Sequence, residues 1–442
     1  MKKMNQQAQE LNTVIQDLNP HIYEMLSRMG KELFFPKGIL SQSAEAREKA
    51  DRINATIGIA KEGGRVMNLP SITRFVAGIE PDGYLPYAPS FGIPQLRKTW
   101  QSALYQKNPS LAGKAISLPV VTSGVTHAVS TFADLWVDPE DTVILPDMMW
   151  GNYTMTLSVR NRAVVSQYRT YTSDLSGLDL DAFEAAVEQE AEKAGKIITI
   201  LNFPHNPTGY SITREEGERI AAFLTDIAKR GTNVVVACDD AYFGLFYEKE
   251  TMKESLFSLL AGADKRIAAV KLDGVTKEDY AWGLRTGFIT YGVSAEGSLE
   301  KLYEALEKKT AGCIRGSISN ASHLSQSVVL RSMEDQEYDN LKQEKFEVLK
   351  ERALAVRDVV FREEYARAWD VYPFNSGYFM CIRLKRDNAE ALRLHLLETY
   401  GTGLISIGEN NLRIAFSCLE KSEVKLLFDT ILKGVEDLQE TP

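Results

Sequence analysis

The sequence has few cysteines and histidines, and neither type is grouped. The 442 residues include four cysteines, none in a C-x-x-C pair, and five histidines, none in an H-E-x-x-H motif. Scattered cysteines argue against a disulfide framework and against a zinc site. We therefore expect no metal site and a reducing, cytoplasmic setting.

Long apolar runs and an excess of positive charge are also absent. No stretch approaches the roughly 18 consecutive apolar residues of a membrane helix, and residues 1–18 are polar, unlike a signal peptide. The net charge of −9 argues against nucleic acid or an anionic membrane as a partner. With 44% hydrophobic and 25% charged residues, the composition is that of a globular protein. The length suggests enough residues to form the cores of two or three domains.

Short apolar runs alternate with longer helical patterns over the first two-thirds of the chain. β-branched residues and turn-like ends predict that these runs are buried strands. The predicted strands are 115–124, 141–147, 196–204, 233–242, 266–274 and 287–292. Segments between them, such as 213–231, have apolar residues at helical spacing. This alternation predicts an α/β fold with a mostly parallel sheet covered by helices on both faces.

The last third of the chain has a different pattern. Residues 341–367 predict a long amphipathic helix, 376–384 and 410–417 predict strands, and 421–438 predict a closing helix. These elements indicate a smaller α+β unit beside the sheet.

The predicted domain division follows from this change of pattern. Residues 71–335 form the large, ligand-binding domain, and residues 1–70 and 336–442 form the small domain. We find no internal repeat, low-complexity tract or long linker.

Residues able to do chemistry cluster where the predicted strands end, which is where open α/β sheets bind ligands. Residues 122–128 combine small and hydroxyl side chains at a helix start, a pattern that suits an anion. Taken singly, the other stretches have simpler explanations. The stretch 206–209 is then a turn, Asp239 and Asp240 are caps or solvated charges, and Trp150 is a core residue.

Together and in this order, these stretches resemble the pyridoxal-phosphate-dependent aminotransferases of class I/II, of the aspartate and aromatic amino-acid type. The resemblance extends from about residue 54 to residue 420. It implies fold type I, a three-layer sandwich with a mostly parallel sheet in a large cofactor domain, plus a smaller α+β domain. The residues that carry it are Tyr84-Leu85-Pro86, Pro146-x-x-Trp150-Gly151-Asn152, Asn206-Pro207-Thr208-Gly209, Asp239-x-Ala241-Tyr242, Lys277 with Gly283-x-Arg285-x-Gly287, and Arg413.

The activity that the resemblance implies is transamination. An amino group would pass from aspartate, glutamate or an aromatic amino acid to a 2-oxo acid, in two ping-pong half-reactions through a lysine Schiff base on pyridoxal 5'-phosphate. An aspartate β-decarboxylase or lyase on the same fold is the alternative. A regulatory protein that keeps only the fold is disfavoured, because Lys277 and Arg413 are both present and no basic domain is appended.

The resemblance assigns roles around the cofactor ring. Lys277 would form the Schiff base and, once freed, move the α-proton of the substrate. Asp239 would face the pyridinium nitrogen and keep it protonated, and the family pattern selects it over Asp240. Tyr242 and Asn206 would donate to the phenolic oxygen of the ring.

At the phosphate, Gly124, Val125 and Thr126 would supply backbone N–H groups and a hydroxyl, and Arg285 a two-pronged guanidinium. Tyr84 is implied to reach the phosphate of the neighbouring subunit. A homodimer with shared sites is therefore expected.

For the substrate, the resemblance assigns Arg413 to the α-carboxylate and Gly58 to the close approach of backbone beside it. Arg315 would reach the distal carboxylate of aspartate or glutamate from the partner subunit, or move aside for an aromatic side chain. Trp150, stacked on the cofactor ring, and Asn206 would border the substrate as well.

Four parts of the sequence depart from the family pattern, and one of them is the stretch 313–320 around Arg315, which lacks the usual tyrosine. Gly274 stands where a phosphate-binding serine is usual, so that Thr276 or water would have to replace its hydroxyl. Tyr153 replaces a common histidine, and residues 58–60 read Gly-Ile-Ala where Gly-Ala-Tyr is usual.

Overall fold

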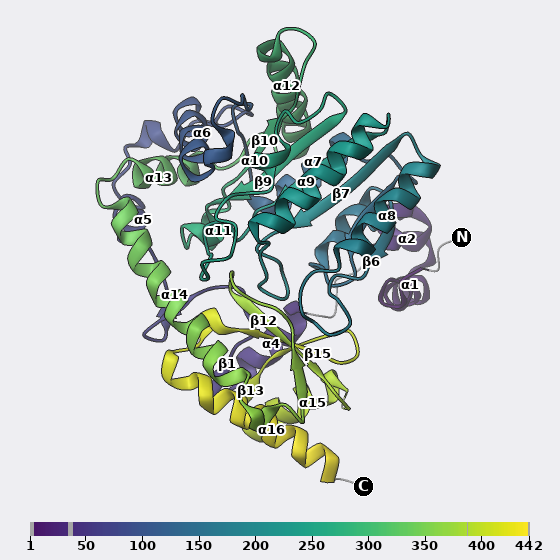
Figure 1. The fold of residues 1–442 in the computed structure, drawn as a ribbon, viewed down its shortest axis with the longest axis vertical. Coiled ribbons are helices and arrows are strands. Elements are labelled where there is room, and N and C mark those ends of the chain that lie inside the picture. Colours follow the sequence, from purple (N-terminus) through teal and green to yellow (C-terminus); the bar gives the residue numbers. More distant parts are fainter. Residues whose placement is uncertain (1–3, 34–38, 387, 441–442) are drawn as a thin grey trace.

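A seven-stranded sheet forms the centre of the larger part of the molecule (Figure 1). The computed structural model describes residues 4–33, 39–386 and 388–440. In spatial order, the strands are β4 (Val120–Thr122), β10 (Gly287–Gly292), β9 (Ile267–Gly274), β8 (Asn233–Asp239), β7 (Lys196–Asn202), β5 (Thr142–Pro146) and β6 (Val164–Tyr168).

The sheet is mostly parallel, as the sequence predicts. Neighbours from β6 to β9 pair in parallel, and β10 alone runs antiparallel to both of its neighbours. The register pairs Asn202 with Asp239 at the carboxyl ends of β7 and β8, and Gly274 with Gly287 at one end of the β9–β10 pair. Polar side chains that are far apart in the chain therefore meet at one edge of the sheet.

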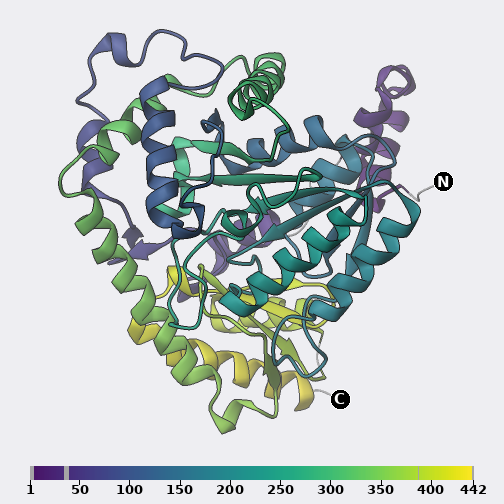
Figure 2. The same cartoon turned by 45° about the horizontal axis from the view of Figure 1, so that its top comes forward.

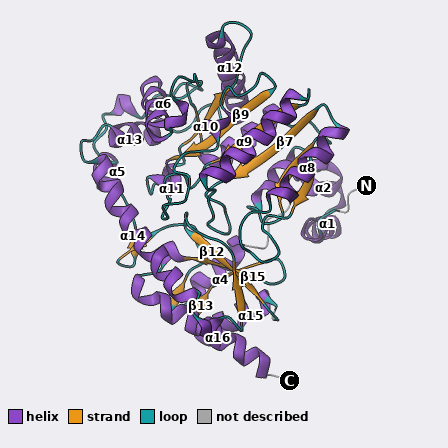
Figure 3. Ribbon diagram, viewed as in Figure 1, coloured by secondary structure: helices purple, strands orange, loops and turns teal. Residues whose placement is uncertain are grey.

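Helices cover both faces of this sheet, which explains why its strands read as continuous apolar runs (Figures 2 and 3). α7 (Gly124–Trp136) packs on β8, β9 and β10, whereas α8 (Leu180–Lys193) and α9 (Arg214–Lys229) pack on β5 to β8. α9 begins with a capping box in which Thr213 and Glu216 exchange side-chain to backbone hydrogen bonds.

A second, antiparallel sheet forms the smaller α+β part. Its strands in order are β11 (Trp369–Val371), β12 (Phe379–Leu384), β15 (Asn411–Ala415) and β14 (Ile405–Ile407). The helices beside it are α4 (Ile39–Lys49), α14 (Tyr338–Val360), α15 (Ala389–Tyr400) and α16 (Val424–Glu440). The other elements are α5 (Pro70–Phe75), α6 (Pro94–Lys107), α10 (Phe257–Leu260), α11 (Val275–Glu278), α12 (Leu299–Ser317), α13 (His323–Met333), the pair β1 (Ile53–Asn54) and β13 (Thr402–Gly403), and the hairpin β2 (Lys61–Glu62) and β3 (Arg65–Val66).

The long helix α14 joins the two parts, and it ends earlier than the sequence predicts. The prediction of 341–367 is wrong at its carboxyl end, because the α-helix stops at Val360. A 3-10 turn follows at Glu363–Tyr365, and it stacks the buried ring of Tyr365 on Trp369 with centroids 5.2 Å apart. The packing of these two rings replaces the last predicted turns of the helix.

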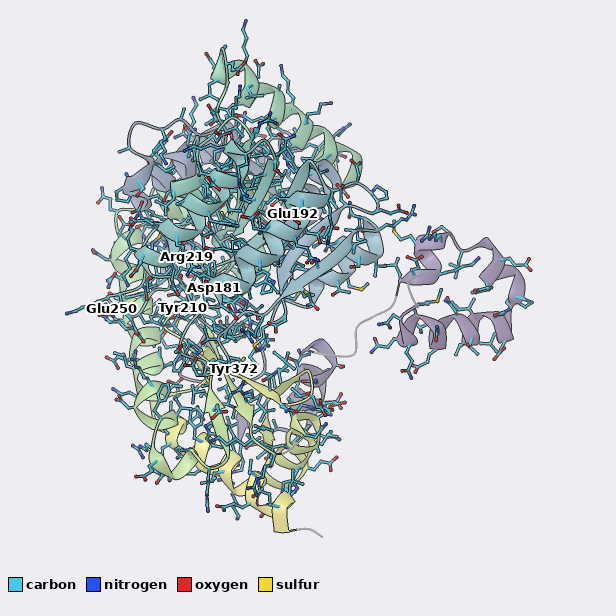
Figure 4. All side chains as sticks on the ribbon, turned by 45° about the vertical axis from the view of Figure 1, so that its right-hand side comes forward. Asp181, Glu192, Tyr210, Arg219, Glu250 and Tyr372 are labelled. Carbon is cyan, nitrogen blue, oxygen red and sulfur yellow. The ribbon has the colours of Figure 1, made fainter. Side chains whose placement is uncertain are left out.

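The N-terminal helices stand to one side of the rest of the chain (Figure 4). α1 (Gln6–Leu18), α2 (Pro20–Met25) and α3 (Arg28–Glu32) pack on one another, and α3 also contacts the π-helix η3 (Thr154–Arg160) beside the large sheet. α4 packs on β14 of the small sheet. The predicted domain boundaries remain a prediction. None of the described helices has the length and apolar character that a membrane crossing needs.

Candidate active site

A pocket lies beyond the carboxyl ends of β7 and β8. It is lined by Val125, Thr126, Trp150, Asn202, Asn206, Asp239, Ala241, Tyr242, Thr276, Lys277 and Arg285. These include nearly all of the residues predicted to hold the cofactor, gathered from five separate stretches of the chain. Their individual roles remain predictions.

Asp239 is buried at the end of β8, and each of its carboxylate oxygens accepts one hydrogen bond. The Tyr153 hydroxyl donates to Oδ2 at 2.6 Å and the Ala241 N–H donates to Oδ1 at 3.1 Å. Burial raises the pKa of Asp239, and the two donors together with the Lys277 charge oppose that rise. Burial also raises the pKa of Tyr153 well above its usual value, so that this residue remains a neutral donor. Sequence reasoning noted Tyr153 as a departure and missed this contact.

Asn202 is a pocket residue that sequence reasoning did not single out. Its side-chain oxygen accepts from the Asn206 N–H, and its side-chain nitrogen donates to the Asp239 carbonyl, both at 2.8 Å. It therefore joins the 206–209 turn to the end of β8. Its place at the last residue of a buried strand was the available signal.

Lys277 lies on α11, a single helical turn that directly follows β9. Its ammonium nitrogen lies 4.8 Å from the centre of the Tyr242 ring. Burial lowers the pKa of Lys277 to about 8, and the positive charge of Arg285 adds to this effect while Asp239 opposes it. A lysine with such a pKa is neutral for a useful fraction of the time near physiological pH, which a nucleophilic amine requires.

A candidate anion site lies where α7 begins. Gly124 has a left-handed φ of 78°, and a Cβ at this position would lie 2.7 Å from a guanidinium nitrogen of Arg285. The glycine thus lets the guanidinium reach the free N–H groups at the start of α7. Val125 and Thr126, the next two residues, line the pocket. Positive charge and helix N–H groups together suit a phosphate.

The structure explains the glycine at position 274. A Cβ on Gly274 would lie 2.6 Å from the Thr286 carbonyl oxygen and 2.8 Å from the Gly287 Cα, both backbone atoms of the paired strand. A serine cannot occupy this position without displacing β10. Two residues later, the buried hydroxyl of Thr276 lines the pocket and has no hydrogen-bond partner among the described residues. Thr276 therefore has an unused donor of the kind that the glycine lacks.

Arg413 is buried on β15, next to the pocket. Its guanidinium donates to the Thr56 carbonyl at 2.9 Å and to the Asn206 side-chain oxygen at 3.4 Å, and it lies 4.1 Å from the centre of the Phe379 ring. In the part of the chain that the structure describes, no carboxylate pairs with it, and its Nε has no partner. A buried guanidinium without a counter-ion suits an anionic ligand. Gly58 lies against the same Phe379 ring.

Arg315 and Tyr84 do not line this pocket. Arg315 is exposed at the end of α12 and donates to the Ser319 hydroxyl at 2.6 Å. Tyr84 is half-buried, and it precedes Leu85 and Tyr87, which are 72% and 88% exposed. Both residues were predicted to act in the site of a neighbouring subunit.

The family model described as aminotransferase class I and II matches residues 77–431. The chain belongs to this family. It is therefore a transaminase, and the enzymes of its family depend on pyridoxal phosphate.

Individual relatives are distant in sequence and close in fold. A probable N-acetyl-LL-diaminopimelate aminotransferase of Bacillus subtilis is 22% identical over 363 residues, covering 80% of each chain. An aspartate aminotransferase of Salmonella typhi is 24% identical over 387 residues, covering 84% of this chain and 91% of its own. A crystal structure of an aminotransferase from Anaerococcus prevotii superposes with a TM-score of 0.82 at 22% identity, covering 92% of this chain and 98% of that one.

Proposed function

We propose that this aminotransferase moves the amino group of aspartate, glutamate or an aromatic amino acid to a 2-oxo acid in two ping-pong half-reactions. The observation that carries the proposal is that Lys277 and the buried Asp239 line one pocket together with Arg285, whose guanidinium lies against Gly124 at the start of α7. Pyridoxal 5'-phosphate, when bound, supplies an aldehyde that takes up a lysine amine as a Schiff base, and a ring that accepts an electron pair.

The pocket residues fit this cofactor. Arg285, the start of α7 and the unpartnered Thr276 hydroxyl suit its phosphate, and Asp239 suits a protonated ring nitrogen. Tyr242 and Asn206 would donate to the phenolic oxygen, and Trp150 would cover one face of the ring. Lys277, as a neutral amine, would take the α-proton of the substrate and deliver it to the C4′ carbon of the cofactor.

Arg413 would hold the α-carboxylate of the substrate. The buried, uncompensated guanidinium supports this role, because a bidentate pair would fix the orientation of the amino acid. Gly58 would leave room for the same carboxylate, and Arg315 of a second subunit would select a distal carboxylate.

A panel of amino donors at fixed 2-oxoglutarate tests the proposed function. We expect turnover with aspartate or with aromatic donors, and oxaloacetate as the product from aspartate. Formation of alanine from aspartate would instead indicate β-decarboxylation. If aspartate were used no better than alanine, the role of Arg315 would be wrong.

We also propose that the enzyme is a homodimer with shared sites. The exposed apolar side chains of Leu85 and Tyr87 beside Tyr84 support an interface at this segment. All four cysteines are free thiols, which suits the proposed cytoplasmic setting.

The hydroxyl of Thr276 is expected to contribute to phosphate binding. Thr276→Val keeps the shape of the side chain and removes the donor, and a hydrogen bond to a charged group is worth roughly 1.5 to 3 kcal/mol. The variant should therefore bind pyridoxal 5'-phosphate roughly tenfold more weakly or worse, as measured by equilibrium dialysis. Pyridoxal without the phosphate is the control and should bind both proteins equally. An equal loss for both ligands would assign the hydroxyl another role.

The rate at which the cofactor-free protein links covalently to pyridoxal 5'-phosphate should depend on pH through Lys277. Only the neutral amine reacts, and its pKa is lowered to about 8. We expect the rate to rise about tenfold per pH unit below that value and to level off above it. Stopped-flow absorbance would measure the profile. A rate that keeps rising towards the ordinary lysine value of 10.5 would contradict the prediction.

A further inference from the structure

The two residues that follow Lys277 are buried carboxylates that do not line the cofactor pocket. Glu278 is 7% exposed and Asp279 is 2% exposed. The Tyr378 hydroxyl also donates to the Lys277 carbonyl at 3.0 Å. The turn that carries the reactive amine is therefore bound by Tyr378 through the Lys277 carbonyl. The two buried carboxylates that follow Lys277 are bound by side chains from other elements.

Two lysines from different helices bind Glu278. Lys107, at the end of α6, forms an ion pair with it, and Lys342, in the first turns of α14, lies 2.9 Å from the same oxygen, Oε1. Lys342 also lies 2.8 Å from Asp279 Oδ1, which accepts a hydrogen bond from the Tyr338 hydroxyl at 2.7 Å. Two ammonium groups thus balance two carboxylates.

Glu278 and Lys342 favour their charged forms. Burial alone would raise the pKa of Glu278, but the charges of Lys107 and Lys342 outweigh that effect and hold the pKa well below its usual range. Burial would lower the pKa of Lys342, and the two carboxylates raise it well above its usual value. Buried charges with several partners have one favoured geometry, because every alternative leaves a charge unpaired.

Helix α14 runs from the cluster towards the smaller α+β part of the molecule (Figure 1). Ten residues after Lys342 on the same helix, the buried Arg352 donates to the Ser417 carbonyl at 2.9 Å. Ser417 lies four residues after Arg413, in the turn that follows β15. A single helix therefore contacts both the turn that carries Lys277 and the turn that follows Arg413.

We infer that Lys342, acting through Glu278 and Asp279, is a positioning residue for Lys277. It fixes the turn that carries the amine relative to the helix that reaches the Arg413 region. This inference rests on the proposed function, in which Lys277 links to the cofactor. The lysine pair explains why the residue after the reactive lysine is a buried glutamate rather than a solvated one.

The test uses cofactor-free full-length protein and two ligands. Pyridoxal 5'-phosphate reacts with the Lys277 amine to give an imine and one water, whereas pyridoxamine 5'-phosphate has no aldehyde and binds without linkage. In Lys342→Met, we expect linkage at least about tenfold slower, because a small misplacement of a reacting group costs rate steeply. Affinity for pyridoxamine 5'-phosphate should remain within about twofold.

Three further variants complete the design. Glu278→Gln should act in the same direction, and Lys342→Arg should restore most of the linkage rate. Lys345→Met is the matched control on the same helix. In the described part of the chain, Lys345 pairs with Glu62 of β2 at 2.7 Å and with no other carboxylate, so this variant should leave both readouts unchanged.

Each outcome decides something. Wild-type linkage in Lys342→Met would overturn the inference and leave the proposed function standing. Loss of both linkage and pyridoxamine 5'-phosphate binding would also overturn it, because the cluster would then support the whole site rather than Lys277. Absence of linkage in the wild-type protein would refute the proposed function itself.

Discussion

Replacing Lys277 by alanine is expected to abolish amino-group transfer. The variant loses the amine that is proposed to link to the cofactor and to move the α-proton. Loss of the proton transfer alone should reduce the rate by roughly 10²- to 10⁴-fold, and loss of the covalent step should lower it further. Single-turnover measurements with an amino donor would record the effect. A variant that turned over at the wild-type rate would end the proposed mechanism.

A binding control separates lost chemistry from a damaged site. The proposed phosphate site of Arg285, Thr276 and the start of α7 does not include the Lys277 side chain. Lys277→Ala should therefore bind pyridoxamine 5'-phosphate nearly as well as the wild type. Borohydride reduction followed by peptide mass spectrometry should find the cofactor on Lys277 in the wild-type protein and on no lysine in the variant.

The large sheet could be predicted because its strands are buried on both faces. Six of its seven strands appear in the sequence as continuous apolar runs. The missed strand, β6, is an edge strand in which Ser166 and Gln167 interrupt the apolar pattern, and no residue of it is fully buried. The antiparallel direction of β10 could not be predicted, since an apolar run reads the same whichever way the strand runs.

The candidate site could be located from strand ends, but its contacts could not. The residue types at positions 206, 239, 242 and 277 match the family pattern, and this match indicates pyridoxal-phosphate chemistry even when the distances between them are unknown. The bond from Tyr153 to Asp239 and the backbone that excludes a Cβ at Gly274 depend on how distant segments pack. For the same reason, the sequence left open which hydroxyl could replace the missing serine.

Lys271 is the clearest residue that sequence reasoning passed over. It stands in the apolar run of β9, where a lysine would ordinarily mark a strand end or an exposed face. In the structure its side chain is fully buried, forms an ion pair with Asp240 and lies 3.6 Å from Asp273 Oδ2. Asp240, which sequence reasoning set aside in favour of Asp239, therefore has a structural partner.

Replacing Lys271 by methionine is expected to destabilise the folded protein by about 3 to 5 kcal/mol. Methionine fills a similar volume, but the variant leaves two buried carboxylates without a cation. The Ser255 hydroxyl at 2.6 Å from Asp240 and the Trp100 indole N–H at 3.2 Å from Asp273 are then their only remaining donors among the described residues. Urea unfolding at a fixed protein concentration would measure the loss.

The pH dependence of the lost stability shows whether unpaired carboxylates or poor packing cause the loss in Lys271→Met. Burial raises the pKa of Asp240, and it raises that of Asp273 to about 6, although Lys271 opposes both shifts. Without Lys271 both pKa values should rise further above the unfolded value of 3.8, so that the folded variant binds more protons than the unfolded chain. Its stability should therefore fall relative to the wild type as the pH rises from about 4 through 6 and beyond.

Lys265→Met, which breaks an exposed pair with Glu296, should cost less than about 1 kcal/mol and show no such trend. A Lys271→Met deficit that did not change with pH would mean that the loss comes from packing and not from the unpaired carboxylates.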